Sequence, residues 1–213
     1  MLKKSLLAAG IGLLLSAAAA QAGPITTPPP TLTAFGNVTA VYVFADAADT
    51  SVLNEDTPAL FSQIFCNHPT GGCAGNNPGD TFSLFPPSQS GAMVFSLDNI
   101  SRGNHFTSDA PDSDGNYHVL ITTNYADFGQ GALPSGADSV IANLLLTSSV
   151  TYIGWEDKTL GQGSDFDYND LIFAFANTRL TTTGVPEPLT LSLFGAGLAG
   201  AAWAVRRRKQ AKA

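Results

Sequence analysis

Positively charged residues are scarce in the body of this 213-residue chain. Of its ten lysines and arginines, only Arg102, Lys158 and Arg179 lie between residues 23 and 205, whereas all seventeen acidic residues lie there. Three cations against seventeen acids give this segment a net charge of −14, against −7 for the whole chain. So negative a field repels nucleic acid and attracts cations, which excludes a nucleic-acid-binding protein.

Signatures of catalysis are missing as well. The chain has no G-x-S-x-G elbow, no H-E-x-x-H pair and no Walker loop, and its histidines, His68, His105 and His118, are scattered. Glycoside hydrolysis needs only two carboxylates and leaves no short motif, so Glu156 with an aspartate remains an alternative acid and base. We expect a protein that is not an enzyme.

Long apolar runs occur only at the two ends of the chain. Lys3 and Lys4 precede an apolar stretch from residue 6 to residue 20, and Ala20-Gln21-Ala22 has the small-x-small pattern that signal peptidase cuts. Residues 1–22 are therefore predicted to form a helical signal peptide. Its removal would export the chain with Gly23 as the new N-terminus.

The C-terminal end combines three features. Val185-Pro186-Glu187-Pro188 comes first, and an uncharged run over 189–205 follows, near the lower length limit for a transmembrane helix. A basic tail over 206–213, which begins with Arg206, Arg207, Arg208 and Lys209, favours a cytoplasmic end. An ordinary membrane anchor explains the run and the tail. It does not explain two prolines, which hold the chain extended as a cleavage site requires.

The order of these parts over residues 185–213 resembles the PEP-CTERM sorting signal of Gram-negative bacteria. In that signal a membrane-embedded exosortase cuts near the Pro-Glu-Pro and frees the protein. The resemblance implies a precursor held in the inner membrane, followed by delivery to the cell surface or to the exopolysaccharide matrix of a biofilm. Exopolysaccharide as a partner is implied by the resemblance alone.

Between the ends, short apolar bursts alternate with clusters of Gly, Pro, Asn and Asp. The spacing predicts a Pro-rich linker over 23–38, one domain over 39–178 and a second linker over 179–184. Strands at short intervals predict an all-β fold, an antiparallel β-sandwich of jelly-roll type, although residues 49–65 leave room for one short helix. The bursts cover residues 41–45, 60–65, 82–85, 92–97, 118–123, 140–146, 150–155 and 171–176.

The two cysteines of the chain, Cys66 and Cys73, both fall in the exported part. An oxidising compartment would allow them to form a disulfide across six residues. A zinc site with His68 is the alternative, but Zn²⁺ requires three or four protein ligands and no further cysteine follows. The spacing therefore favours the disulfide.

The strongest local signal is an acidic turn between Trp155 and Leu171, where five acids face one lysine. Clustered carboxylates raise one another's pKa unless a cation neutralises them, and Ca²⁺ accepts six to eight oxygen ligands. The D-x-D-x-N spacing and its neighbours predict a calcium site. An EF-hand is excluded because its sixth position lacks Gly and its twelfth lacks Glu. The predicted ligands are Glu156, Asp157, Asp165, Asp167, Asn169 and Asp170.

The run Asp165 to Phe173 also resembles the end of a family of exported bacterial domains of unknown function, which close with D-x-D-Y-N-D-L and often precede a PEP-CTERM signal. That resemblance implies a β-sandwich and a bound cation, without an assigned reaction. A solvated turn whose side chains bond nearby amides is the alternative. A second turn with Asp112, Asp114 and Asn116 repeats the spacing, and Asp114 or His118 could serve the same ion.

Two roles remain open for the predicted domain. The first is a non-catalytic calcium-binding domain that exosortase sorts to the surface. The second is a calcium-dependent carbohydrate-binding module, because four aromatic residues near the acidic loop could stack on sugar rings. These residues are Tyr152, Trp155, Phe166 and Tyr168.

Overall fold

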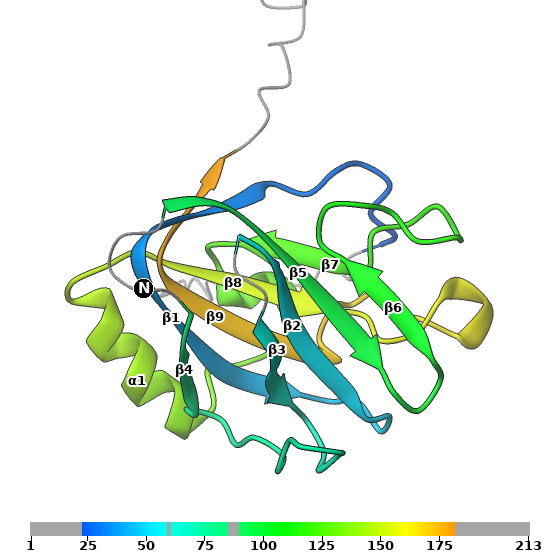
Figure 1. Cartoon of the computed structure of the whole chain (residues 1–213), viewed down its shortest axis with the longest axis horizontal. Coiled ribbons are helices and arrows are strands. Elements are labelled where there is room, and N and C mark those ends of the chain that lie inside the picture. The colour runs from blue at the N-terminus through cyan, green and yellow to red at the C-terminus, as the bar shows by residue number, and fades with distance from the viewer. Residues whose placement is uncertain (1–22, 59–60, 85–89, 182–213) are drawn as a thin grey trace, which may run out of the picture.

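The computed structural model of the chain describes residues 23–58, 61–84 and 90–181. These residues form nine strands, one α-helix and two 3₁₀ helices (Figure 1). The strands are β1 (Thr31–Ala45), β2 (Ser51–Thr57), β3 (Phe61–Cys66), β4 (Thr81–Ser83), β5 (Ser90–Asn99), β6 (Asn104–Thr107), β7 (Val119–Thr122), β8 (Val150–Trp155) and β9 (Leu171–Thr181). The helices are η1 (Tyr125–Phe128), α1 (Ser135–Leu145) and η2 (Leu160–Gln162).

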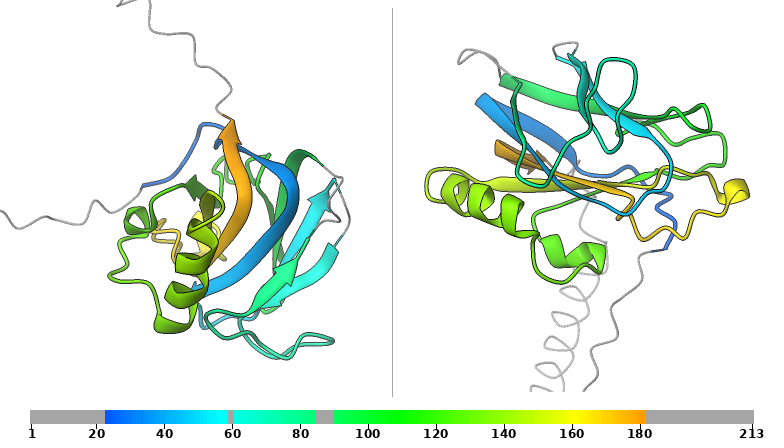
Figure 2. Two further views of the ribbon diagram at one scale, coloured as in Figure 1. Left: turned by 90° about the vertical axis from the view of Figure 1, so that its left-hand side faces the viewer. Right: turned by 90° about the horizontal axis from the view of Figure 1, so that it is seen from below.

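All strand pairings in the described part are antiparallel, and the order along the sheet is β3-β2-β5-β1-β9-β8-β7. Strand β5 joins two layers. Its first residues pair with β1, with Met93 opposite Leu32, and its later residues pair with β2 and β6. Two views at right angles show β2, β3 and the end of β5 facing β1 and β9, with α1 on the far side (Figure 2).

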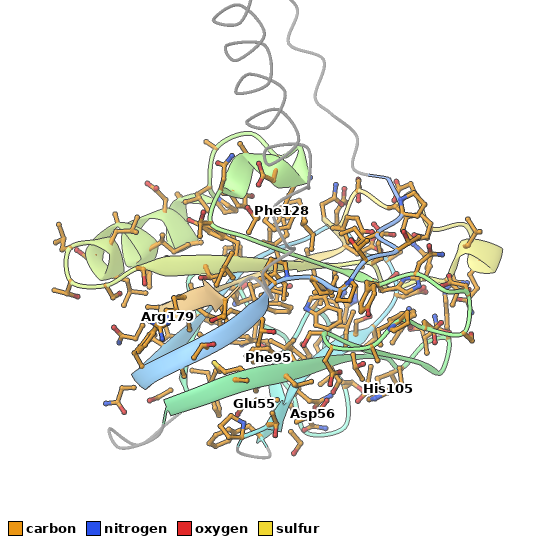
Figure 3. All side chains as sticks on the ribbon, turned by 90° about the horizontal axis from the view of Figure 1, so that it is seen from above. Glu55, Asp56, Phe95, His105, Phe128 and Arg179 are labelled. Atoms are coloured by element: carbon orange, nitrogen blue, oxygen red, sulfur yellow. A yellow bond between two sulfur atoms is a disulfide. The ribbon has the colours of Figure 1, made fainter. Side chains whose placement is uncertain are left out.

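Two hydrophobic cores follow from the alternation of side chains along the strands. On β9, Phe173 and Phe175 enter the core between the two sheet layers, whereas Ile172 and Ala174 enter the core beneath α1. Phe95 packs in the first core with its ring centroid 4.6 Å from that of Phe175. Figure 3 shows Phe95 between the layers and Phe128 on the side of α1. Strands β8 and β9 are therefore covered on both faces.

The prediction of an all-β fold is confirmed in that the described residues are mostly antiparallel sheet. The strand predicted over 140–146 is wrong, because these residues belong to α1 and the turn that ends it. Short apolar runs do not distinguish a strand from one face of a helix. Ala137 and Ile141 are buried one helical turn apart, whereas Leu146 is 81% exposed.

The strand boundaries differ from the prediction at both edges of the domain. Strand β1 begins at Thr31, so much of the predicted linker over 23–38 is sheet, and Ile25 forms a bridge with Tyr117. Strand β9 extends to Thr181, into the second predicted linker. The prolines at 28–30 indicated a linker, although apolar and polar residues alternate directly after them, as in a strand. The described residues of 49–65 contain no helix, since β2 and β3 occupy most of them.

A disulfide joins Cys66 and Cys73, and the ring Nδ1 of His68 lies 3.2 Å from the carbonyl oxygen of Asp49. The predicted signal peptide over 1–22 and the sorting signal over 185–213 lie outside the described residues. Within the described ranges, no helix has both the length and the apolar character that a membrane crossing requires.

Gly154 allows the acidic loop to lie against β8. A Cβ atom at this position would lie 2.2 Å from the carbonyl oxygen of Tyr168 and 2.3 Å from the ring of Phe128. Both neighbours are buried, and one is backbone that cannot rotate away. A side chain here would therefore push the loop from the sheet.

We expect Gly154→Ala to destabilise the protein by about 1–3 kcal/mol, as overpacking usually does. For a chain of this size that lowers the melting temperature by about 2–4 °C per kcal/mol. Thermal unfolding of the full chain in detergent measures the change. Gly131→Ala is the control because a Cβ there meets nothing within 4 Å. Equal melting of the two variants would contradict the steric account.

Candidate metal centre

The candidate site is the loop between β8 and β9, which projects from the sheet at the end away from α1 (Figure 1). Side chains from two other segments hold this loop. The amides of Asn104 and Gln162 form a reciprocal pair, at 2.6 and 3.2 Å, and Asn104 also donates to the carbonyl of Asp157. The N–H of Leu160 donates to Asp114 at 3.0 Å. The loop is thus tied to β6 and to the 112–116 turn.

The first two loop residues, Glu156 and Asp157, continue the direction of β8. Successive side chains along an extended chain point to opposite faces. Glu156 consequently enters the side that holds Phe166 and Tyr168, whereas Asp157 enters the side that holds Ser51 and Asn99. Both carboxylates are fully buried, at 0% exposure. This alternation divides the acids of the loop into two groups.

The first group consists of Glu156, Asp165 and Asp167, each of which offers one oxygen within 4.8 Å of the others. Phe166 and Tyr168 have left-handed backbone angles, with φ of 54° and 57°. Their rings are buried, while Asp165 is exposed and Asp167 half-buried. Glu156 accepts a hydrogen bond from the N–H of Tyr168 at 2.7 Å and another from the hydroxyl of Ser164. The group therefore sits at the rim, with one buried member.

Electrostatics within this group oppose full ionisation. Burial raises the pKa of Glu156, and the charges of Asp165 and Asp167 raise it further, against the hydrogen bonds from Ser164 and Tyr168. The pKa of Asp167 is also raised, chiefly by burial and then by Asp165. In the described part of the chain no lysine or arginine pairs with any of the three. Three carboxylates therefore meet without a lysine or arginine beside them in the part of the chain that the structure describes.

The second group consists of Asp157 and Asp170, and it has a cation of its own. Asp170 accepts the N–H of Asp157 at 3.0 Å, and the Lys158 ammonium lies 3.6 Å from the Asp157 carboxylate. Burial, with the charges of Asp157 and Glu156, raises the pKa of Asp170 to about 8. Lys158 acts in the opposite direction. This group is partly neutralised by the protein.

The ligand set predicted from the sequence is consequently divided. The structure brings Glu156, Asp165 and Asp167 together, whereas Asp157 and Asp170 are not part of this group and the Asp170 carboxylate accepts the backbone N–H of Asp157. Asn169 lies beside Asp167 and donates to its carboxylate through both its N–H, at 3.2 Å, and its side-chain amide. The local spacing identified the loop, but it did not show which acids share a face.

The second acidic turn lies next to this loop but forms a separate group. Asp112 and Asp114 gather with His118, whereas Asn116 is occupied by local bonds to Asp114. The carbonyl of His118 accepts the N–H of Glu156, so the two groups are neighbours through the backbone. The sequence left open a single ion shared by both turns. The separation of the two groups argues against such a shared ion.

The aromatic residues expected to stack on sugars are buried. Their exposed fractions are 6% or less, and they pack in the two cores. They are Tyr152, Trp155, Phe166 and Tyr168. These rings are too buried to form the sugar-stacking surface that the sequence left open as an alternative.

Two contributors were missed in the sequence. Ser164, whose hydroxyl bonds Glu156, carries no signal beyond its place in a polar loop. Lys158 was noted only as the lysine among five acids. If the alternation of side chains along β8 is extended beyond Trp155, Glu156 and Asp157 point to opposite faces. This extension would have separated the two groups of acids.

Comparison with known proteins gives one match, which lies outside the described residues. The model of the PEP-CTERM protein-sorting motif matches residues 184–209. No curated protein and no solved structure matches the chain. The match covers the prolines, the apolar run and the first basic residues that the sequence singled out. This chain therefore carries a PEP-CTERM sorting motif at its C-terminal end, which implies processing by exosortase and sorting to the surface.

Proposed function

We propose that this protein is a non-catalytic surface protein whose β domain holds a calcium ion in the loop between β8 and β9. Glu156, Asp165 and Asp167 supply the protein carboxylates. One observation carries the proposal: three carboxylates, one of them fully buried, each offer an oxygen within 4.8 Å of the others, and none of the described lysines or arginines pairs with them. A hard divalent cation relieves this repulsion with the oxygen ligands it prefers.

The three positive side chains of the domain support this proposal because each is used elsewhere. Arg102 pairs with Asp49, Lys158 lies against Asp157, and the Arg179 guanidinium lies 4.0 Å from the centre of the Phe35 ring. In a domain of such negative charge, an external cation is the available counter-charge. Calcium at this point would connect the end of β8, through Glu156, to the segment that leads into β9.

Delivery to the surface suits such a domain. Extracellular modules bind calcium with dissociation constants of roughly 10⁻⁴–10⁻³ M. Three carboxylates and water molecules are enough ligands for so weak an affinity. We infer that calcium completes the fold after export. Exopolysaccharide as the final attachment follows only from the sorting motif.

Hydrolysis of a glycoside fits the site less well. Glu156, the candidate acid, is fully buried, and both of its oxygens accept hydrogen bonds from Ser164 and Tyr168. A general acid must reach the leaving-group oxygen of its substrate. This geometry favours a structural role for Glu156 over an acid and base role.

Calcium should raise the melting temperature of the full chain in detergent. At a free concentration one hundred times the dissociation constant the gain is about 2.7 kcal/mol, roughly 5–10 °C for a protein of this size. Asp167→Asn removes one charge with little change of shape, so it should reduce this gain. Asp138→Asn, on the exposed face of α1, should leave it unchanged. Identical melting of the wild type in chelator and in calcium would overturn the proposal.

Asp170, buried beside Asp157, should give the calcium-free protein a defined pH dependence. The pKa of Asp170 rises from 3.8 to about 8 in the folded state. The folded state therefore binds this proton more tightly than the unfolded state does. The resulting stabilisation is complete below about pH 4 and is lost as the pH rises through about 8.

Asp170→Asn keeps an oxygen that accepts the N–H of Asp157 but cannot ionise. Between pH 5 and pH 9 in chelator, its melting temperature should fall less than that of the wild type. Asp138→Asn should follow the wild type. If Asp170→Asn shows the wild-type slope, Asp170 is not the group that titrates.

Exosortase processing should depend on the two prolines of the motif. We expect the double variant Pro186→Ala, Pro188→Ala to accumulate as an uncut membrane-held precursor in a host with exosortase, since the extended conformation is lost. Fractionation and immunoblotting follow the product. Pro29→Ala, in the N-terminal segment, is the control. Release of the double variant at the wild-type rate would refute this dependence.

A further inference from the structure

The second cluster of metal-ligating side chains contains a nitrogen donor. Asp112, Asp114 and His118 each offer one ligand atom within 4.8 Å of the others. The turn that carries the aspartates is closed by backbone bonds, from Asp112 N–H to Asn116 and from Gly115 N–H to Asp112, both at 2.9 Å. These bonds fix the two carboxylates on the side of His118.

His118 is a buried imidazole with no polar partner, among the described residues, outside this cluster. Its side chain is 0% exposed, and its ring stacks on Phe106 with centroids 4.1 Å apart. Phe166 packs against the ring from the loop, at 5.7 Å. Nε2 meets only Asp114, and Nδ1 has no hydrogen bond. A buried imidazole nitrogen without a hydrogen bond has lost its contact with water and gained no partner, which costs free energy. This cost is tolerable only if the other ring nitrogen makes a strong contact.

The distances between Asp114 and His118 suit two ligands of one metal ion as well as they suit a long direct hydrogen bond. Nε2 lies 3.3 Å from Oδ1 and 3.2 Å from Oδ2 of Asp114. A charge-assisted hydrogen bond is shorter, about 2.7–2.9 Å. Two ligands of a tetrahedral Zn²⁺ with bonds of about 2.0–2.1 Å lie about 3.3 Å apart. The separation is therefore the one that two zinc ligands would have.

A pocket of about 190 Å³ lies beside this cluster and is lined by Asp112 and His118 among others. Asp112 and His118 border this open space, so a metal ion held by them and by Asp114 would keep a fourth position for water or a small anion, as in zinc sites that are not purely structural. His105 also lines this pocket, and its side chain is 59% exposed. The opening gives a metal ion a path to the buried imidazole.

We infer that Asp112, Asp114 and His118 form a second metal site, selective for Zn²⁺ over Ca²⁺. An imidazole with two carboxylates suits zinc, whereas calcium prefers oxygen ligands alone. The loop between β8 and β9 offers only oxygens from its three acids, so the two neighbouring clusters differ in the metal they accept. This site uses none of the residues of the calcium site and stands independently of it.

Zinc titration of the metal-free full chain in detergent, followed by calorimetry in the presence of excess calcium, tests the site. We expect one zinc ion per chain, and X-ray absorption at the zinc edge should show a single imidazole ligand. Asp112→Asn should weaken binding by more than about 100-fold, because even loss of an outer-shell partner costs 10–100-fold. Asp109→Asn, exposed in the same segment, should bind as the wild type does.

His118→Gln should also abolish the imidazole signal. Should that buried variant fail to fold, the half-buried Asp112→Asn decides, with its melting temperature in chelator as the check on folding. His105→Asn distinguishes this site from adventitious binding at the exposed histidine and should retain zinc. Equal zinc binding by Asp112→Asn and wild type, or no zinc binding by wild type, would overturn the inference. Loss of the calcium response alone would leave it standing.

Discussion

The burial of two adjacent carboxylates at the end of β8 is the constraint on which the site depends. Glu156 and Asp157 are both inaccessible to solvent, and the alternation of an extended chain sends them to opposite faces. Each must be stabilised by what it meets there. Asp157 meets Ser51 and Lys158, whereas Glu156 meets two further acids. Our proposal of an external cation beside Glu156, and of none beside Asp157, rests on this difference.

The scaffold allows this arrangement because it encloses the acidic loop from several sides. Gly154 admits the backbone of Tyr168 against β8, and Asn104 and Asp114 bind the loop from β6 and from the neighbouring turn. Tyr168 in turn holds the N-terminal segment, since its hydroxyl accepts the N–H of Ile25 at 3.0 Å. The first residues of the domain and its acidic loop are thus parts of one packed end.

Local patterns in the sequence identified the acidic loop, the sorting motif and most strands, because each depends on residues close together in the chain. The sorting motif at 184–209 can be recognised from the order of its residues alone. The division of the acids required knowing that β8 continues into Glu156 and Asp157. The helix α1 was mistaken for a strand because residues 140–146 are apolar except for Asn143, although only one face is buried. The burial of Tyr168 depends on segments far away in the chain, since its hydroxyl bonds Ile25 and Tyr117, and no local pattern shows such contacts.

The central claim is that calcium occupies the face of Glu156 and leaves the face of Asp157 to Lys158. Long-wavelength anomalous diffraction from crystals grown in calcium tests it most directly. We predict an anomalous peak bounded by Glu156, Asp165 and Asp167, with no peak between Asp157 and Asp170. A peak at Asp157 and Asp170, or no peak in the loop at saturating calcium, would contradict the account.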